Sequence, residues 1–122
     1  MFVSHIKEIT EIPLEGDNIK NAVKKVLIGP GEGWKDYVMR LFTLKKDGFS
    51  PRHTHPWIHV NIVLEGKGTL FLEGKDYPME KGSVALIPEN ALHQFKADRG
   101  EDLSFICIVP LEGEQGYQSE QR

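Results

Sequence analysis

Cysteine is almost absent from this sequence of 122 residues, since Cys107 is the only one. A single cysteine allows no disulfide within the chain, which argues against a secreted, disulfide-stapled domain. There is also no apolar run near the ~20 residues that a membrane-spanning helix needs. The first residues carry no apolar stretch of signal-peptide length. These absences predict a cytoplasmic protein that does not enter a membrane.

The chain also lacks a block of basic charge. It has 15 Lys and Arg against 18 Asp and Glu, a formal net charge of −3, and the two signs are mixed along the sequence. Surfaces that bind nucleic acid are usually strongly basic. We therefore expect no nucleic-acid partner.

Long stretches with a helical period are missing as well, whereas 12 glycines and 7 prolines separate short apolar runs. This pattern predicts an all-β sandwich or barrel. Residues 17–25 fit either a short helix or an edge strand. No repeat or linker is visible, so we expect a single domain over residues 1–122, with a core at about 20–112 and a polar, frayed tail at 113–122. The expected strands span residues 23–28, 37–44, 59–64, 69–73, 84–87, 93–96 and 103–109.

Four of the five histidines form the pattern that carries chemistry. His53 and His55 are two residues apart, so in an extended chain they project from one face, and His59 keeps the same parity. His93 must come from a strand that lies opposite. Neutral imidazole binds Zn, Cu, Fe, Ni and, less tightly, Mn. The four histidines together predict one divalent metal ion held by their rings. The alternative is that they bind no metal, with surface histidines in a turn or His93 as a core residue whose polar atoms are satisfied.

The spacing around the first three histidines resembles the first motif of the cupin family. The sequence reads Gly48-x4-His53-x-His55-x3-His59-x6-Gly66, and the family pattern has a glycine at each end, His-x-His, and then a glutamate. His59 stands where the family usually has that glutamate ligand. The gap before His53 is one residue shorter than in the family pattern.

A later stretch of the sequence resembles the second motif of the cupin family. It reads Gly82-x5-Pro88-x-Asn90-x2-His93-x3-Ala97. Asn90 replaces a glycine, and asparagine is the next-best residue for a positive φ. Ala97 replaces an asparagine. Because His59 replaces the usual glutamate, the sequence most resembles the small four-histidine manganese cupins. This resemblance covers roughly residues 20–114.

This resemblance implies a cupin jelly-roll β-barrel with a metal ion inside it, and usually a homodimer. It makes Mn the first expectation for the ion and Fe the next. Affinity of an all-nitrogen site rises from Mn towards Cu, so Zn or Ni in a purified sample would reflect supply.

The missing carboxylate changes the charge of the expected site. Four neutral histidines leave a divalent ion near +2, where three histidines and a glutamate would leave it near +1. The ion is then a stronger Lewis acid, and an ion that accepts six ligands keeps two open positions. The alternative is a closed tetrahedral site that only stabilises the fold.

Four further residues are candidates for a substrate pocket. The last expected strand alternates, and the resemblance turns Phe105 and Cys107 toward the metal; otherwise Cys107 is an inert core residue. Arg40, in an apolar strand, either reaches into the barrel to hold an anionic substrate or points to solvent. Trp57 either forms the rim of the mouth or simply packs.

Three functions fit these features. The first is a Mn- or Fe-dependent oxidoreductase, of dioxygenase or peroxide-dependent type, that acts on a small organic molecule. The second is a metal-dependent isomerase or lyase, and the third is a binding module for a small molecule. No catalytic residue stands out besides the metal ligands, which favours chemistry carried by the metal.

Overall fold

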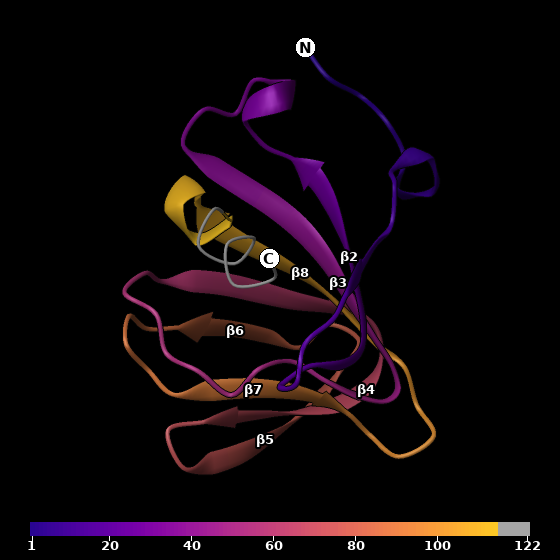
Figure 1. Cartoon of the computed structure of the whole chain (residues 1–122), viewed down its shortest axis with the longest axis vertical. Helices are drawn as coiled ribbons and strands as arrows, with labels where there is room; N and C mark the ends of the chain where they lie inside the picture. The colour runs from indigo at the N-terminus through magenta and orange to yellow at the C-terminus, as the bar shows by residue number, and fades with distance from the viewer. Residues whose placement is uncertain (115–122) are drawn as a thin grey trace.

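Short runs rich in Val, Ile, Leu and Phe, separated by glycine turns, form a closed β-barrel in the computed structural model, which describes residues 1–114 (Figure 1). The elements are η1 (Ile6–Glu8), β1 (Ile12–Leu14), β2 (Lys20–Ile28), η2 (Pro30–Glu32), β3 (Tyr37–Phe49), β4 (His59–Leu72), β5 (Lys75–Glu80), β6 (Val84–Ile87), β7 (His93–Ala97) and β8 (Leu103–Pro110). The all-β expectation and the jelly-roll barrel are confirmed.

A ring of four antiparallel strands closes the barrel. β8 lies between β3 and β4 and pairs with both, and β7 pairs with β4 along its length and with β3 at Phe49. In Figure 1, β2 and β3 form the upper side, and β5, β6 and β7 form the lower side. Side chains of both sides meet in the interior, where the histidines also lie.

β4 differs from the expectation of two strands at 59–64 and 69–73. It runs without a break, and a register shift between Val63 and Glu65 marks where it bends. Gly66 has a φ of 87°, and a Cβ there would collide with the carbonyl of Asp102. The glycine therefore marks a bend inside a strand and not the end of one.

Four other elements differ from the expectation. β3 continues to Phe49 through residues 45–48, where a turn was expected, and the ambiguous residues 17–25 belong partly to β2. β1 and β5 were not predicted. β5 reads as a turn because only Met79 of its six residues is buried.

The last strand alternates as expected, and Leu103, Phe105, Cys107 and Val109 form its buried face. Phe105 stacks on Phe95 with ring centroids 4.2 Å apart and on Phe42 at 5.7 Å. This aromatic stack belongs to the hydrophobic core and also lines the cavity beside the histidines.

The tail expected to fray at 113–122 begins differently, because Gly113 and Glu114 are buried. Residues 111–114 form a helical turn after β8, and residues 115–122 lie outside the described part of the chain. Over residues 1–114, no helix is both long and apolar enough to cross a bilayer.

Candidate metal centre

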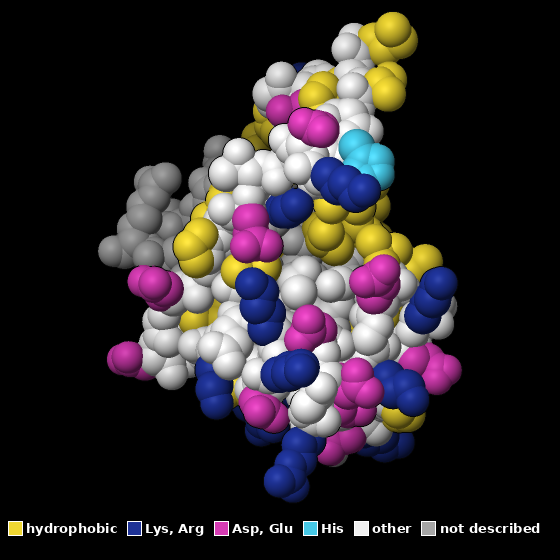
Figure 2. All heavy atoms as spheres, turned by 90° about the vertical axis from the view of Figure 1, so that its right-hand side faces the viewer, with side chains coloured by type: hydrophobic (Ala, Val, Ile, Leu, Met, Phe, Trp, Pro, Cys, Tyr) yellow, Lys and Arg dark blue, Asp and Glu magenta, His cyan; other side chains and the backbone are white. Residues whose placement is uncertain are grey.

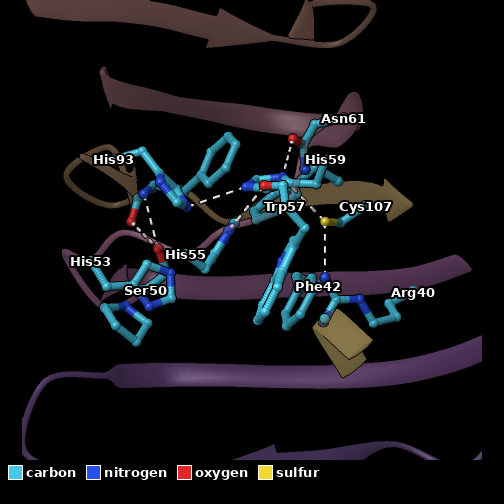
Figure 3. A pocket seen from close by; sticks show the side chains of 14 residues that line it. Arg40, Phe42, Ser50, His53, His55, Trp57, His59, Asn61, His93 and Cys107 are labelled. Carbon is cyan, nitrogen blue, oxygen red and sulfur yellow. Dashed lines mark hydrogen bonds between the residues drawn. The ribbon is translucent and has the colours of Figure 1, made fainter. Parts of the chain in front are cut away.

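Four histidine rings converge inside the barrel from three segments (Figure 3). His53 and His55 come from the loop between β3 and β4, while His59 opens β4 and His93 opens β7. His53 and His93 form an isolated bridge, in which each backbone N–H donates to the other residue's carbonyl at 3.1 Å. The bridge ties the loop to β7, so the rings meet because the barrel closes there.

The distances between ring nitrogens suit one ion. His53, His55 and His93 each offer a nitrogen within 4.8 Å of the other two. His59 Nε2 lies 3.2 Å from His93 Nε2, and its ring centroid is 5.0 Å from that of His55. Bonds of ~2.0–2.3 Å place two ligand nitrogens at most ~4.6 Å apart. Three rings form a compact cluster close to that limit, and the fourth joins it through His93.

The opposite nitrogen of three rings has an acceptor on the outside of the cluster. Nδ1 of His55 lies 3.2 Å from the Trp57 carbonyl, Nδ1 of His93 lies 2.9 Å from the Ala91 carbonyl, and Nδ1 of His59 lies 2.9 Å from Asn61 Oδ1. The Asn61 amide is oriented by its own N–H, which donates to the Ile106 carbonyl at 3.4 Å. A proton on each Nδ1 leaves each Nε2 with its lone pair facing inward, the tautomer that a metal requires.

Facing lone pairs provide a direct test of whether an ion fits. With protons on both Nδ1 atoms, Nε2 of His59 and Nε2 of His93 are two acceptors at 3.2 Å. Two acceptors at this distance repel unless a cation lies between them, one ring gains a proton, or one ring carries its proton on Nε2 instead of Nδ1. Burial opposes the second solution, and the acceptors beside the two Nδ1 atoms oppose the third. The donor set therefore fits one divalent cation.

Burial keeps the rings of His55, His59 and His93 neutral. Burial, followed by the charges of His59, His93 and His53, lowers the pKa of His55 to about 3. Burial is also the largest cause that lowers the pKa of His59 and of His93, each to about 4. Metal ions bind neutral imidazole, so these three rings are ready to bind a metal at any pH above these values.

A cavity of about 60 Å³ lies against the histidines. Its wall is mainly aromatic, with the ring of Trp57 stacked on that of His55 at a centroid distance of 4.6 Å. The four pocket candidates from the sequence, Arg40, Trp57, Phe105 and Cys107, all line it. Among the described residues that line the cavity there is no Asp or Glu.

A chain of contacts leads from His59 to a buried charge cluster. Cys107 Sγ lies 3.5 Å from His59 Nδ1, and Arg40 donates from Nη2 to Cys107 Sγ at 3.0 Å (Figure 3). Arg40 Nη1 donates to Glu114 Oε1 at 3.3 Å, and Lys24 Nζ donates to Glu114 Oε2 at 2.8 Å. Burial lowers the pKa of Lys24, while its bond to Glu114 opposes the shift.

Three residues of this region were not predicted from the sequence. Asn61 follows His59 by two residues on the same strand, so its parity placed it beside that ring. Lys24 shares the parity of Ala22 and Val26, and a lysine on an apolar strand face was a signal for a buried partner. Glu114 gave no signal because it lies in a polar segment.

Comparison with known proteins agrees with this architecture. The cupin domain family matches residues 40–109. Auxin-binding protein 1 of Arabidopsis thaliana is 34% identical over 86 residues, which is 63% of this chain but only 43% of that protein. The chain thus spans less than half of this curated relative.

Two solved structures resemble the whole barrel. The polyketide cyclase RemF of Streptomyces resistomycificus superposes with a TM-score of 0.85 and 26% identity, over 90% of this chain and 79% of that one. A predicted oxalate decarboxylase of Thermotoga maritima gives 0.79 and 21%, over 90% and 99%, a likeness in fold alone. Because the family match covers more than half of the sequence and the barrel agrees, the chain belongs to the cupin domain family.

Proposed function

We propose that His53, His55, His59 and His93 hold one divalent metal ion, and that the protein oxidises a small organic substrate with dioxygen or hydrogen peroxide. The observation that carries the proposal is the donor set. Four imidazoles converge, and the described lining of the cavity offers no carboxylate to act as a general base. This donor set favours chemistry that is carried by the metal.

The proposed ion is Mn(II), with Fe(II) as the next candidate, as the four-histidine motif implies. Such an ion supplies Lewis acidity and redox chemistry, and with neutral ligands its charge stays near +2. An overall two-electron oxidation with hydrogen peroxide reduces the peroxide to water while the substrate loses two electrons. If a purified sample contains Zn or Ni, we attribute it to the metals available during preparation, because nitrogen ligands bind these ions more tightly than Mn.

The walls of the cavity define what the chain's own residues do. Phe42 and Phe105 stack on each other, and Trp57 stacks on His55. These rings exclude water from the histidine cluster and favour a substrate with a flat, apolar body. Asn61 holds the His59 ring by its Nδ1 atom, so its role is to orient a ligand.

The test compares metals in one protein. The metal-free chain is reloaded with Mn(II), Fe(II) or Zn(II), and oxidation of a small aromatic alcohol to its aldehyde by hydrogen peroxide is followed by mass spectrometry of the product and by peroxide consumption. We expect oxidation by the Mn- or Fe-loaded protein and none by the Zn-loaded protein. The variant His93→Ala, treated with the same metals, should also show no oxidation. Equal rates with Mn and Zn would refute redox chemistry.

A second candidate is a non-redox cyclisation or isomerisation, which the 26% identity to the polyketide cyclase RemF supports. There the ion would polarise a carbonyl group. Turnover with Zn under anaerobic conditions would favour this reading. The similarity to auxin-binding protein 1 supports a third candidate, binding without turnover, for which a tight ligand that remains unchanged is the sign.

A further inference from the structure

His55 is held by a loop, whereas strands of the barrel hold the other three candidate ligands. His59 and His93 each open a strand, and the backbone bridge to His93 ties His53 to β7. His55 lies between β3 and β4, where its carbonyl accepts a hydrogen bond from the Asn90 N–H at 2.8 Å. Sites on loops are less precise than sites on strands, so the His55 ring needs side-chain contacts to keep its place in the cluster.

Two parts of one residue hold this ring. The carbonyl of Trp57 lies 3.2 Å from His55 Nδ1, and the indole of Trp57 stacks on the imidazole with ring centroids 4.6 Å apart and planes 10° apart (Figure 3). The carbonyl fixes which ring nitrogen faces inward, and the stacked indole limits the tilt of the imidazole. Carboxylates often orient metal-binding histidines. Here acidic side chains are mixed with basic ones on the barrel face in Figure 2, and the described lining of the cavity has no Asp or Glu.

A bound ion strengthens the contact between the two rings. An imidazole that gives its lone pair to a divalent ion takes on part of the positive charge of that ion. The face of an aromatic ring attracts positive charge, and indole does so best. The stack is therefore stronger with the ion than without it, and by linkage the same stack raises the affinity of the site for the ion.

The indole is itself packed against a glycine of the turn that follows β8. A Cβ on Gly113 would lie 2.9 Å from Trp57 Nε1 and 3.1 Å from Trp57 Cε2. It would also lie 2.9 Å from the Cβ of Val109, which is fixed to the backbone of β8. Any side chain at Gly113 therefore pushes against the indole, and the absence of one lets the backbone of the turn approach it closely.

We propose that Trp57 is a positioning residue for the metal ligand His55, and that Gly113 is required because only a residue without a side chain lets the indole lie against that ring. The inference rests on the proposed function, since it concerns the metal that His55 would bind. The indole face that meets His55 is already occupied. On this side Trp57 therefore acts on the ligand and not on a substrate.

The test titrates the metal-free full-length chain with Co(II), in competition with a chelator. Trp57→Leu removes the aromatic face and keeps the backbone carbonyl, and we expect it to bind Co(II) ~3–10-fold more weakly, the scale of one aromatic pair. Trp57→Phe keeps a ring that can stack and should recover most of the affinity. The visible absorption of bound Co(II) reports the geometry of its ligands, so it should change in Trp57→Leu and return in Trp57→Phe. A purely structural role of Trp57 would lower stability and leave this spectrum as it is in wild type.

The role of the glycine is tested by a double-mutant cycle. Gly113→Ala should weaken Co(II) binding when Trp57 is present and cause little further loss in the Trp57→Leu background, where no indole is displaced. Gly31→Ala is the matched control, because a Cβ there would have no described atom within 4 Å beyond its chain neighbours, and it should bind Co(II) as wild type does. Equal losses from Gly113→Ala in both backgrounds would overturn the link between the glycine and the indole.

A fluorescence measurement leaves both proposed positions intact. Trp34→Phe makes Trp57 the only tryptophan of the chain, and Co(II) should quench its emission because the indole lies against a ligand of a paramagnetic ion. The proposal is overturned if this emission is unchanged at saturating Co(II), or if Trp57→Leu keeps the affinity and spectrum of wild type. Wild type that binds no Co(II) would refute the metal site as well. Failure of the peroxide assay with Mn leaves these binding results standing, so the two failures are distinguishable.

Discussion

The low pKa of His59 leads to a measurable acid sensitivity of the metal-free protein. Burial holds the pKa of this ring at about 4, against 6.5 for an exposed imidazole. Below pH 6.5 the unfolded chain gains a proton at His59, whereas the folded chain stays neutral there until about pH 4. Stability is therefore lost as the pH falls through this window, and it is fully present above pH 6.5.

The size of the effect follows from the two pKa values. Between pH 7 and pH 5 the difference in proton binding at His59 lowers the free energy of unfolding by about 2 kcal/mol. His93 acts in the same direction, because its pKa is also lowered to about 4. A protein with a total stability of ~5–15 kcal/mol loses a sizeable part of it by such shifts.

The assay is urea unfolding of the chain after metal removal, at pH 7 and at pH 5, for wild type and for His59→Gln. We expect the variant to lose about 2 kcal/mol less than wild type over this interval, because it has no ring to titrate there. Saturating metal should make the acid loss of wild type larger, since the ion binds only neutral rings. An identical loss in wild type and His59→Gln would show that His59 titrates in the folded barrel as it does in the unfolded chain.

Four further predictions concern the metal site and the assembly. His59→Glu should still bind one metal, because it restores the usual ligand of the family, but its oxidation rate should differ from wild type; equal rates for wild type, the variant and the metal-free chain would exclude the metal as catalyst. Asn61→Leu should lower metal affinity ~10–100-fold in a competition titration with a chelator, since the His59 ring loses its acceptor, and an unchanged affinity would contradict the role assigned to the amide. Peroxide treatment of the metal-loaded protein should oxidise Cys107, as seen by mass spectrometry, whereas oxidised Met39 or Met79 beside an intact thiol would place Cys107 out of reach of the metal. Light scattering at micromolar concentration should give twice 13.8 kDa, because the outer face of β4 and β6 exposes large apolar side chains that a second copy would cover, and the mass of one chain would rule the dimer out.

Histidine spacing and strand parity were enough to predict much of the site. His53, His55 and His59 share a parity, and Asn90 has the positive φ of 62° expected where the family has glycine. The burial of Cys107 follows from alternation in the last strand, but which face turns inward depended on the resemblance, because both faces are apolar. Local pattern thus predicts which residues share a face of a strand, and the closure of the barrel decides what they meet.

The buried charge cluster of Lys24, Arg40 and Glu114 could not be predicted from the sequence for the same reason. Lys24, Arg40 and Glu114 are joined across 74 to 90 positions of the sequence. Nothing local to a polar segment tells that its glutamate will be buried, since the pairing depends on where the chain returns after β8. The long strand β4 was missed because Gly66 reads as a turn, although it only bends a continuing strand.

The hydrogen-bond acceptors at the Nδ1 atoms of the histidine rings differ in whether a single substitution can replace them. His55 and His93 rest on the carbonyls of Trp57 and Ala91, which belong to the backbone and persist through almost any substitution. His59 rests on the side chain of Asn61, which one codon change replaces by an acid, a hydroxyl or a hydrocarbon. Evolution can therefore adjust the electron richness of one ligand while the other two stay fixed, and related barrels with different reactivity should differ first at this position.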